Sequence, residues 1–271
     1  MKFLNSELNF LIPIKVKKLI RLGRNFDGGY LVCNDTLKKC KNLISLGVGD
    51  DTSFERDFEK LDHTKYIYLY DYTVNYKLFL KIILKYFRRL ILFRCKFSNL
   101  AYSIDNFIKF NNFISKKNVS LFKEKVVSKF KNKGDVTLDK VFRRLGYEKN
   151  ILLKVDIEGD EYLIIDQIMK FHSQIQMLII EFHWINKNIK EFSKIINKLN
   201  SKFQIIHLHP NNYKKTKNND YFFDVVEISF IHKNNLGNKN RFYRYKFPIS
   251  GLDFDCFSDR PSINFSFKKK F

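Results

Sequence analysis

ILLKVDIEGDEYLIIDQI, residues 151–168, combines an apolar strand, a tight turn and the start of a helix. Three of its acids, Glu158, Asp160 and Glu161, suit the first turn of a helix, where the positive end of the helix dipole favours them. Asp156 is different, because it ends a buried strand, and open α/β sheets place functional groups at that edge. The stretch therefore predicts a sheet covered by helices, with a functional carboxylate at the end of one strand.

Short apolar or β-branched runs alternate with helical stretches along most of the chain. The expected strands are 43–46, 66–70, 119–122, 151–155, 177–182, 203–208 and 224–232, and the expected helices are 52–61, 136–146, 161–171 and 189–199. This alternation predicts an α/β fold with a doubly wound, mostly parallel sheet and helices on both faces. Only a loop (214–220) separates the last two strands, so we expect them to pair antiparallel.

The length of 271 residues and a hydrophobic content of 45% suit one globular domain. Within it we expect an amino-terminal cap (1–34), a core (35–232) and a carboxy-terminal extension (233–271). The four cysteines show no C-x-x-C pairing, which indicates a reducing compartment rather than a zinc knuckle or disulfide framework. No apolar run reaches the ~18 residues of a membrane span, and the amino end lacks a cleavage site. We therefore expect a cytoplasmic protein.

The formal net charge is +22, from 50 Lys and Arg against 28 Asp and Glu. Such an excess attracts an anionic partner, and nucleic acid, an acidic membrane and a phosphorylated substrate all qualify. Lys, Asn, Ile and Phe are abundant throughout the chain, so a general compositional bias explains part of the excess equally well. Charge alone does not choose among these partners.

A glycine-containing turn follows the first core strand, in LISLGVGDDTSFE (43–55). Its two glycines let the backbone approach a ligand closely. We expect Asp51 or Thr52 to cap the following helix, with Glu55 completing a capping box. The turn lacks the third glycine of a dinucleotide-binding loop and the lysine of a Walker loop, so it matches neither.

Asp71 ends the next strand, 22 residues after Gly49. At this spacing an acid accepts hydrogen bonds from a ribose diol, so the turn and Asp71 together indicate a nucleoside cofactor. Asp50 and Asp51 would repel a pyrophosphate but would attract an ammonium or sulfonium group, which places Asp51 at the cofactor. S-adenosylmethionine therefore fits this turn better than a nicotinamide dinucleotide.

The order and spacing of five features resemble the FkbM-type S-adenosylmethionine-dependent methyltransferases. These features are GVGDDTSFE (47–55), Asp71 at the end of the second strand, VTLDKVF (136–142), KVDIEGDEY (154–162) and IIEFHW (179–184). RLGRNFDGGYLV (21–32) and VVEISFIH (225–232) are similar to segments of the family's broader relatives. The resemblance implies a Rossmann-like methyltransferase sheet whose last strand is antiparallel.

The same resemblance implies roles for residues of the cofactor turn. Gly47 and Gly49 would line the methionine part of S-adenosylmethionine, Glu55 would support the turn, and Asp71 would hold the ribose. The loop GVGDD differs from the commoner family form, which has an asparagine and a later glycine.

Asp156 and Glu181 end neighbouring strands, so both are expected in the crevice at the carboxyl edge of the sheet, beside the cofactor's methyl group, with Asp156 also a cofactor contact. Methyl transfer to a hydroxyl requires that the hydroxyl lose its proton, either to a positioned base or with the help of a metal. Asp156, Glu181 and His183 are our candidates for both roles, with Mn or Mg as the ion. The alternative for Glu181 is a structural ion pair with Lys154.

Two further polar residues follow in HLHP (207–210) and the loop after it. We expect His209, near the strand's end, and Asn211, in the loop, to contact the substrate. A lone histidine is more often structural, and this alternative stays open for His209.

The segment 77–96 mixes Lys and Arg with Leu, Ile and Phe and predicts a basic amphipathic helix. Such a helix either covers a sheet with a solvated basic edge or rests on an anionic membrane. RFYRYKF (241–247) interleaves aromatic and basic residues in a way that suits single-stranded nucleic acid. KVDIEGDEY occupies the place of the paired prolines typical of base-methylating enzymes, so nucleic acid is not the partner we expect.

The sequence therefore predicts an S-adenosylmethionine-dependent O-methyltransferase. The resemblance and the basic surface indicate a sugar hydroxyl as acceptor, on a surface glycan of capsule or lipopolysaccharide type or on its nucleotide-activated precursor. Two alternatives remain. One is an RNA methyltransferase, and the other is a non-enzymatic module on a methyltransferase fold that binds nucleic acid or membrane.

Overall fold

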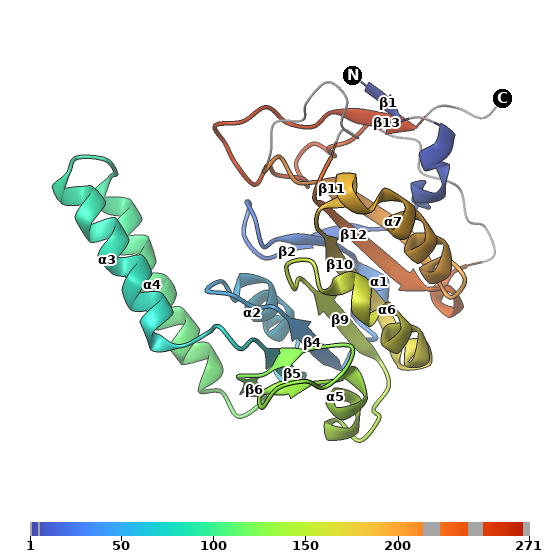
Figure 1. The fold of residues 1–271 in the computed structure, drawn as a ribbon, viewed down its shortest axis with the longest axis horizontal. Coiled ribbons are helices and arrows are strands. Elements are labelled where there is room, and N and C mark those ends of the chain that lie inside the picture. Colours follow the sequence, from blue (N-terminus) through green and yellow to red (C-terminus); the bar gives the residue numbers. More distant parts are fainter. Residues whose placement is uncertain (1, 5, 214–222, 238–245, 268–271) are drawn as a thin grey trace.

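A seven-stranded sheet forms the centre of the computed structural model, which describes residues 2–4, 6–213, 223–237 and 246–267 (Figure 1). In spatial order its strands are β11 (Phe203–Pro210), β12 (Val226–His232), β10 (Ile175–Phe182), β9 (Ile151–Val155), β4 (Asn42–Leu46), β5 (Tyr66–Tyr70) and β6 (Val119–Phe122). β12 runs antiparallel to both of its neighbours, and every other neighbouring pair is parallel. The predicted doubly wound sheet with an antiparallel last strand is confirmed.

Helices cover both faces of this sheet. The helices are α1 (Asn34–Leu37), α2 (Ser53–Lys60), α3 (Tyr76–Ile91), α4 (Phe97–Ile114), α5 (Leu138–Arg144), α6 (Glu161–Lys170) and α7 (Ile185–Leu199). Along β9, Leu153 packs in the core beneath α5, α6 and α7, whereas Leu152 packs in the core beneath α1 and α2. This alternation is the period of two that a strand imposes, and it explains why 151–155 is apolar throughout.

A hairpin near the amino terminus lies against the second face. Its strands β2 (Leu19–Leu22) and β3 (Tyr30–Cys33) are antiparallel, and Ser229 of the central sheet donates a hydrogen bond to the carbonyl of Leu31 (2.6 Å). Two smaller parallel pairs join β1 (Lys2–Leu4) to β13 (Phe265–Phe267) and β7 (Lys125–Val126) to β8 (Asp135–Val136). The loop 23–29 between β2 and β3 reaches the carboxyl edge of the sheet, because Asp27 and Gly28 line a cavity there together with residues that follow β4, β5 and β9.

The turn after β4 packs directly on the turn after β9. Gly47 adopts φ +75°, and a Cβ atom added there would lie 1.6 Å from the carbonyl oxygen of Asp156. The amide of Gly47 donates to Tyr70 (2.9 Å), and that of Asp156 donates to Leu46 (3.0 Å). Only glycine fits this contact, which ties the ends of β4, β5 and β9 together.

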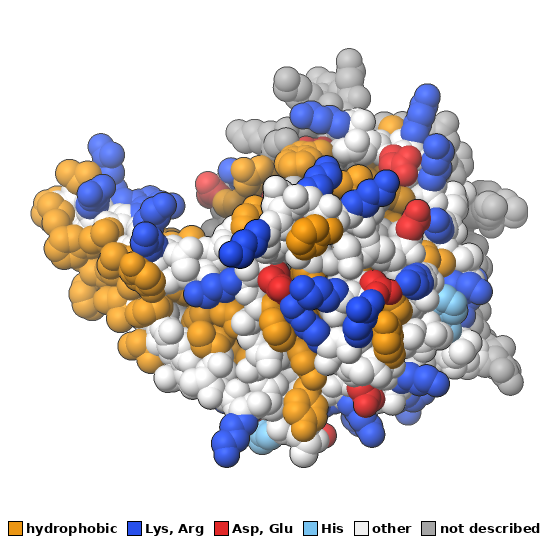
Figure 2. Space-filling model, turned by 60° about the horizontal axis from the view of Figure 1, so that its bottom comes forward, with side chains coloured by type: hydrophobic (Ala, Val, Ile, Leu, Met, Phe, Trp, Pro, Cys, Tyr) orange, Lys and Arg blue, Asp and Glu red, His pale blue; other side chains and the backbone are white. Residues whose placement is uncertain are grey.

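Helices α3 and α4 form an arm (residues 76–114) that projects from the sheet (Figure 1). The predicted helix 77–96 ends at Ile91, and the second helix of the arm was not predicted. Phe79 packs on Phe107 and Phe110 near the base of the arm, with ring centroids 5.1 and 4.7 Å apart. Hydrophobic side chains gather on the outside of the arm (Figure 2).

None of the helices in the described ranges is long and apolar enough to cross a membrane. Two predicted segments, the loop 214–220 and most of the aromatic and basic run 241–247, lie outside the described residues.

Candidate active site

Two adjoining cavities lie at the carboxyl edge of the parallel strands. The first, of about 530 Å³, is bounded by the turns after β4, β5 and β9. The second, of about 420 Å³, is bounded by the ends of β10 and β11. Four residues line both cavities, namely Asp27, Asp156, Glu158 and Trp184. Ligands in the two cavities would therefore meet beside Asp156.

Five of the predicted cofactor residues line the first cavity: Gly47, Gly49, Asp51, Asp71 and Asp156. The Asp71 carboxylate accepts hydrogen bonds from the amide of Gly49 (2.8 Å) and from the amide (2.7 Å) and hydroxyl (2.6 Å) of Thr73. These bonds fix its orientation and leave capacity for one more donor. Apart from Gly49 itself and its two chain neighbours, the described residues place no atom within 4 Å of where a Gly49 Cβ would be, so bare backbone faces open space there.

The first cavity is acidic although the chain is strongly basic. Its charged lining residues are the acids Asp27, Asp50, Asp51, Asp71, Glu124, Asp156, Glu158 and Asp160 and the bases Arg24, Lys125 and Lys154. Arg24 pairs with Asp51 (3.3 Å), and Lys125 pairs with Asp160 (2.7 Å). Burial raises the pKa of Asp50. The surplus of carboxylates favours a cationic ligand and disfavours a pyrophosphate.

Glu55 lies beneath this cavity and does not line it. Its carboxylate accepts a hydrogen bond from Ser45 (2.6 Å) and lies 3.7 Å from the ammonium of Lys154. The predicted capping box is wrong, because the buried lysine draws Glu55 inward and Thr52 makes no side-chain cap. Asp51 instead accepts from the Ser53 amide (3.0 Å) at the start of α2. Lys154 therefore pairs with Glu55 rather than with Glu181.

The second cavity brings the predicted catalytic residues together. The hydroxyl of Tyr30 lies 3.1 Å from Asp156 Oδ2 and 3.3 Å from Glu181 Oε2, within hydrogen-bond distance of both. Asn211 donates to Glu181 Oε1 (3.3 Å). Burial, with the nearby charge of Asp156, raises the pKa of Glu181 to about 8, and burial also raises the pKa of Asp156. Folding therefore favours the protonated form of Glu181.

His183 is held by Glu161, which is fully buried. One Glu161 oxygen accepts from the His183 amide (2.6 Å) and lies 3.2 Å from its Nδ1 atom. This contact turns Nε2 toward three carboxylates, those of Glu158 (3.6 Å), Glu181 (3.9 Å) and Asp156 (4.0 Å). Burial lowers the pKa of His183, but the hydrogen bond to Glu161 and the charge of Glu181 outweigh it, and the pKa is about 9.

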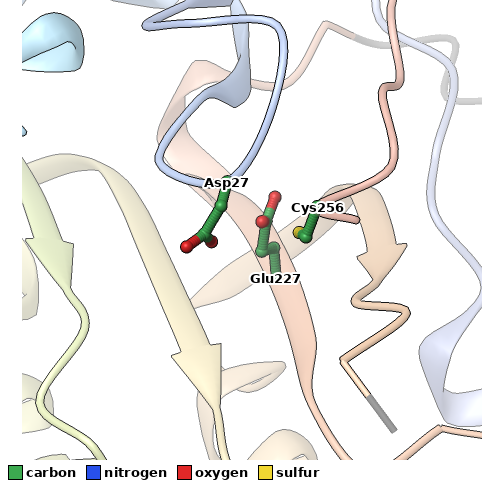
Figure 3. Close-up of side chains that lie close together, drawn as sticks. All are labelled: Asp27, Glu227 and Cys256. Atoms are coloured by element: carbon green, nitrogen blue, oxygen red, sulfur yellow. The ribbon is translucent and has the colours of Figure 1, made fainter. Parts of the chain in front are cut away.

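Two groups of side chains among the described residues could hold a metal ion, each with ligand atoms within 4.8 Å of one another. The first is Asp156, Glu158 and His183, so Glu158 joins two of the three predicted ligands in place of Glu181. Its oxygen and nitrogen donors suit Mn or Mg. The second is Asp27, Glu227 and Cys256, in which Glu227 of β12 lies between the other two (Figure 3). Its thiol suits a softer ion.

The two predicted substrate residues lie in different places. Asn211 lines the second cavity, as do Tyr213 and Phe257. His209 lines neither cavity. Its Nδ1 atom lies 3.6 Å from Asp253, and burial lowers its pKa to about 4, so it is neutral at physiological pH.

Several residues of the site were missed from the sequence. Tyr30 follows the glycines Gly28 and Gly29 and was not predicted as a site residue, and Glu161 was assigned to the helix dipole. Trp184 adopts φ 52°, and its ring lies 2.1 Å from where a Gly159 Cβ would be. Gly159 thus makes room for the indole, which lines both cavities. The resemblance of 21–32 to relatives of the family was the one available signal for Tyr30.

Glu181→Gln should stabilise the protein at alkaline pH. The pKa of Glu181 is about 8 in the folded chain and about 4.3 in an unfolded one. The stability of the wild type is therefore complete below about pH 4 and is lost as the pH rises through 8, whereas glutamine mimics the protonated acid. We expect the free energy of unfolding of the variant to exceed that of the wild type by about 1–3 kcal/mol near pH 8.5, and to match it near pH 4. Denaturant titrations at both pH values measure this.

Glu191→Gln is the control, because Glu191 is an exposed acid on α7. The difference between its free energy of unfolding and that of the wild type should be the same at both pH values. A Glu181→Gln variant that is less stable than the wild type at both pH values would contradict the assignment of a buried, protonated acid.

Comparison with known proteins gives one family and several distant folds. The family model described as Methyltransferase FkbM domain matches residues 27–223. No curated protein matches the sequence.

Three of the solved structures that match the chain are methyltransferases by name. The precorrin-6y C5,15-methyltransferase of Geobacter metallireducens GS-15 is 14% identical, with 73% of this chain and 87% of that chain covered and a TM-score of 0.36. The N-methyltransferase NodS of Bradyrhizobium japonicum WM9 is 10% identical, with 73% of this chain and 92% of that chain covered and a TM-score of 0.36. The 23S rRNA methyltransferase ErmE is 8% identical, with 73% of this chain and 66% of that chain covered and a TM-score of 0.38. At this level of similarity they carry no information on substrate.

Proposed function

The chain belongs to the FkbM methyltransferase family, and from that premise we propose that it transfers a methyl group from S-adenosylmethionine to a sugar hydroxyl. The acceptor would be a surface glycan of capsule or lipopolysaccharide type, or its nucleotide-activated precursor. The observation that carries the proposal is the pair of adjoining cavities that meet at Asp156. The first offers groups suited to the methyl donor, and the second offers polar groups suited to a polyhydroxyl acceptor.

The first cavity fits the donor's chemistry. S-adenosylmethionine supplies a methyl group on a positively charged sulfur. Asp71 has capacity to accept from the ribose diol, and the bare backbone at Gly49 leaves room for the methionine part. The surplus carboxylates suit an ammonium and a sulfonium. Arg24, which pairs with Asp51, is the arginine of this lining and would also meet the donor's own carboxylate.

The second cavity suits a neutral sugar. Its charged residues within the described part of the chain are five acids and one histidine, namely Asp27, Asp156, Glu158, Glu181, Asp224 and His183. A polyphosphate would be repelled there, which argues against RNA as the acceptor and keeps the diphosphate of a nucleotide sugar outside the cavity. Trp184 offers a flat apolar face to a sugar ring, and Asn211 offers an amide to its hydroxyls.

Asp156 is the proposed base. The hydroxyl oxygen forms a bond to the methyl carbon while the bond from that carbon to sulfur breaks, and the hydroxyl proton passes to the Asp156 carboxylate. Tyr30 orients this carboxylate (3.1 Å). Glu161 orients His183, whose Nε2 atom lies 4.0 Å from Asp156. As a cation, His183 stabilises the charged form of the Asp156 carboxylate. A divalent ion on Asp156, Glu158 and His183 would lower the pKa of the hydroxyl instead.

Asp71→Asn should weaken donor binding by about 1–3 kcal/mol, because a charge-assisted hydrogen bond to the ribose becomes a neutral one. Calorimetry with S-adenosylmethionine measures the change. Asp62→Asn is a matched control, since Asp62 accepts from the amide (2.9 Å) and hydroxyl (2.7 Å) of Thr64 as Asp71 does from Thr73, but lines neither cavity. Unchanged affinity in a folded Asp71→Asn variant would remove Asp71 from the donor site.

Asp156→Asn should slow turnover by roughly 10²–10⁴ and leave donor affinity nearly intact, if Asp156 acts as a direct base. In that case a chelator has no effect. If an ion is required, chelation abolishes turnover and added Mn restores it better than Mg, because the imidazole ligand favours Mn. Initial rates with and without chelator distinguish the two. Full activity of Asp156→Asn would contradict either mechanism.

A screen of acceptors with radiolabelled S-adenosylmethionine tests the substrate class. We expect label in neutral oligosaccharides or nucleotide sugars, with a mass increase of one methyl group, and none with the Asp156→Asn variant. Label in RNA with none in any glycan would favour an RNA methyltransferase. Salt-dependent RNA binding without any methyl transfer would favour the non-enzymatic alternative.

A further inference from the structure

The arm formed by α3 and α4 has no part in the proposed methyl transfer. None of its residues lines either cavity. Its base is nevertheless fixed to the first cavity, because Asn106 donates to the carbonyl of Asp50 (2.7 Å) and Arg24 donates to the hydroxyl of Tyr102 (3.4 Å). The arm is therefore anchored in position, and its outer part requires a separate explanation.

Each helix of the arm presents an apolar stripe to solvent. On α3 the stripe is Leu80, Leu84, Phe87 and Ile91, and on α4 it is Phe97, Ile104 and Ile108. This spacing places each set on one side of its helix. The seven side chains are 41 to 69% exposed, and Figure 2 shows a broad hydrophobic field on the arm. A contiguous hydrophobic field of this kind on a solvent-exposed face marks an interaction site.

The turn between the two helices strengthens this conclusion. Phe93 occupies the left-handed position after α3 (φ 54°), with its amide donating to Leu90 (2.9 Å) and the amide of Arg94 donating to Arg89 (2.7 Å). Glycine is the usual residue there, because a side chain in this conformation is strained. The Phe93 ring is 97% exposed. It therefore adds strain and gains no packing within the part of the chain that the structure describes, which indicates that its contacts lie in a partner.

Basic side chains flank the stripes. Residues 76–114 contain eight Lys and Arg and a single acid, and that acid, Asp105, is paired with Lys109 (2.6 Å). On α3, Lys77, Lys81, Lys85 and Arg88 recur at helical spacing beside the apolar stripe. Figure 2 shows Lys and Arg along the edge of the hydrophobic field.

We propose that this arm docks on the surface of an anionic lipid bilayer. The apolar stripes and Phe93 enter the boundary between headgroups and acyl chains, and the flanking Lys and Arg contact lipid phosphates. A second copy of the chain is disfavoured as occupant, because two arms with this surplus of positive charge repel each other. Nucleic acid would satisfy the bases but would leave Leu and Ile side chains without an apolar partner.

Phe93→Gly separates binding from folding, because glycine relieves the backbone strain while removing the ring. The full chain is mixed with phosphatidylcholine vesicles, with or without phosphatidylserine, and bound protein is measured by flotation. We expect binding to the phosphatidylserine vesicles that weakens with salt, and little binding to phosphatidylcholine alone. Phe93→Gly should lower the partition coefficient roughly tenfold with no loss in melting temperature. Arg88→Gln with Arg89→Gln should lower it by a similar factor.

Tyr147→Gly is the matched control, since Tyr147 is an exposed aromatic residue with a positive φ (56°) outside the arm, and it should bind vesicles as the wild type does. Three results would overturn the proposal: no binding to phosphatidylserine vesicles, equal loss in Tyr147→Gly, or a dimer in light scattering that Phe93→Gly dissociates. Vesicle binding needs neither donor nor acceptor, so failure of the proposed methyl transfer leaves this test unaffected.

Discussion

The close contact between the turns after β4 and β9 is the constraint on which the first cavity depends. A side chain at Gly47 would overlap the carbonyl of Asp156, so glycine alone allows the two strand ends to meet. Because β5 hydrogen-bonds to the same turn through Tyr70, the ends of three strands converge there. Asp71 and Asp156, each the first residue after its strand, therefore face one cavity although 85 residues separate them in the sequence.

Next to this point the sheet buries more acid than base. Glu181 of β10 and Glu227 of β12 are register partners, both are buried, and burial raises the pKa of each. The charge of Arg21 lowers the pKa of Glu227, but it offsets only part of the rise that burial causes. A core arranged for stability alone would hold apolar residues at these positions, because a buried carboxylate destabilises unless it is protonated or paired. Buried acids that reduce the stability of the fold are typical of functional sites, so their position points to this region of the sheet.

The features that the sequence predicted are those set by local periodicity and chain direction. Strands and helices of the sheet follow from periods of two and 3.6, and Asp71, Asp156 and Glu181 were predicted because parallel strands end at one edge. Tyr30 and Glu161 were missed because their roles depend on tertiary contacts, one from a hairpin that folds over the sheet and the other from a helix start that meets the next strand end. The second helix of the arm was missed because its apolar stripe faces solvent, whereas periodicity is normally interpreted as burial.

The distribution of charge separates two properties that net charge combines. The chain carries +22 overall, yet acids outnumber bases in the lining of both cavities, so most of the basic residues lie elsewhere, including the arm. The potential of the whole molecule governs which surfaces it approaches, and the local potential of a cavity governs which groups enter it. A basic exterior with acidic cavities can be attracted to an anionic surface while it rejects phosphate from the reacting centre. The net charge therefore bears on the surfaces that the protein approaches, and the carboxylates around Asp156 bear on the groups that enter the cavities.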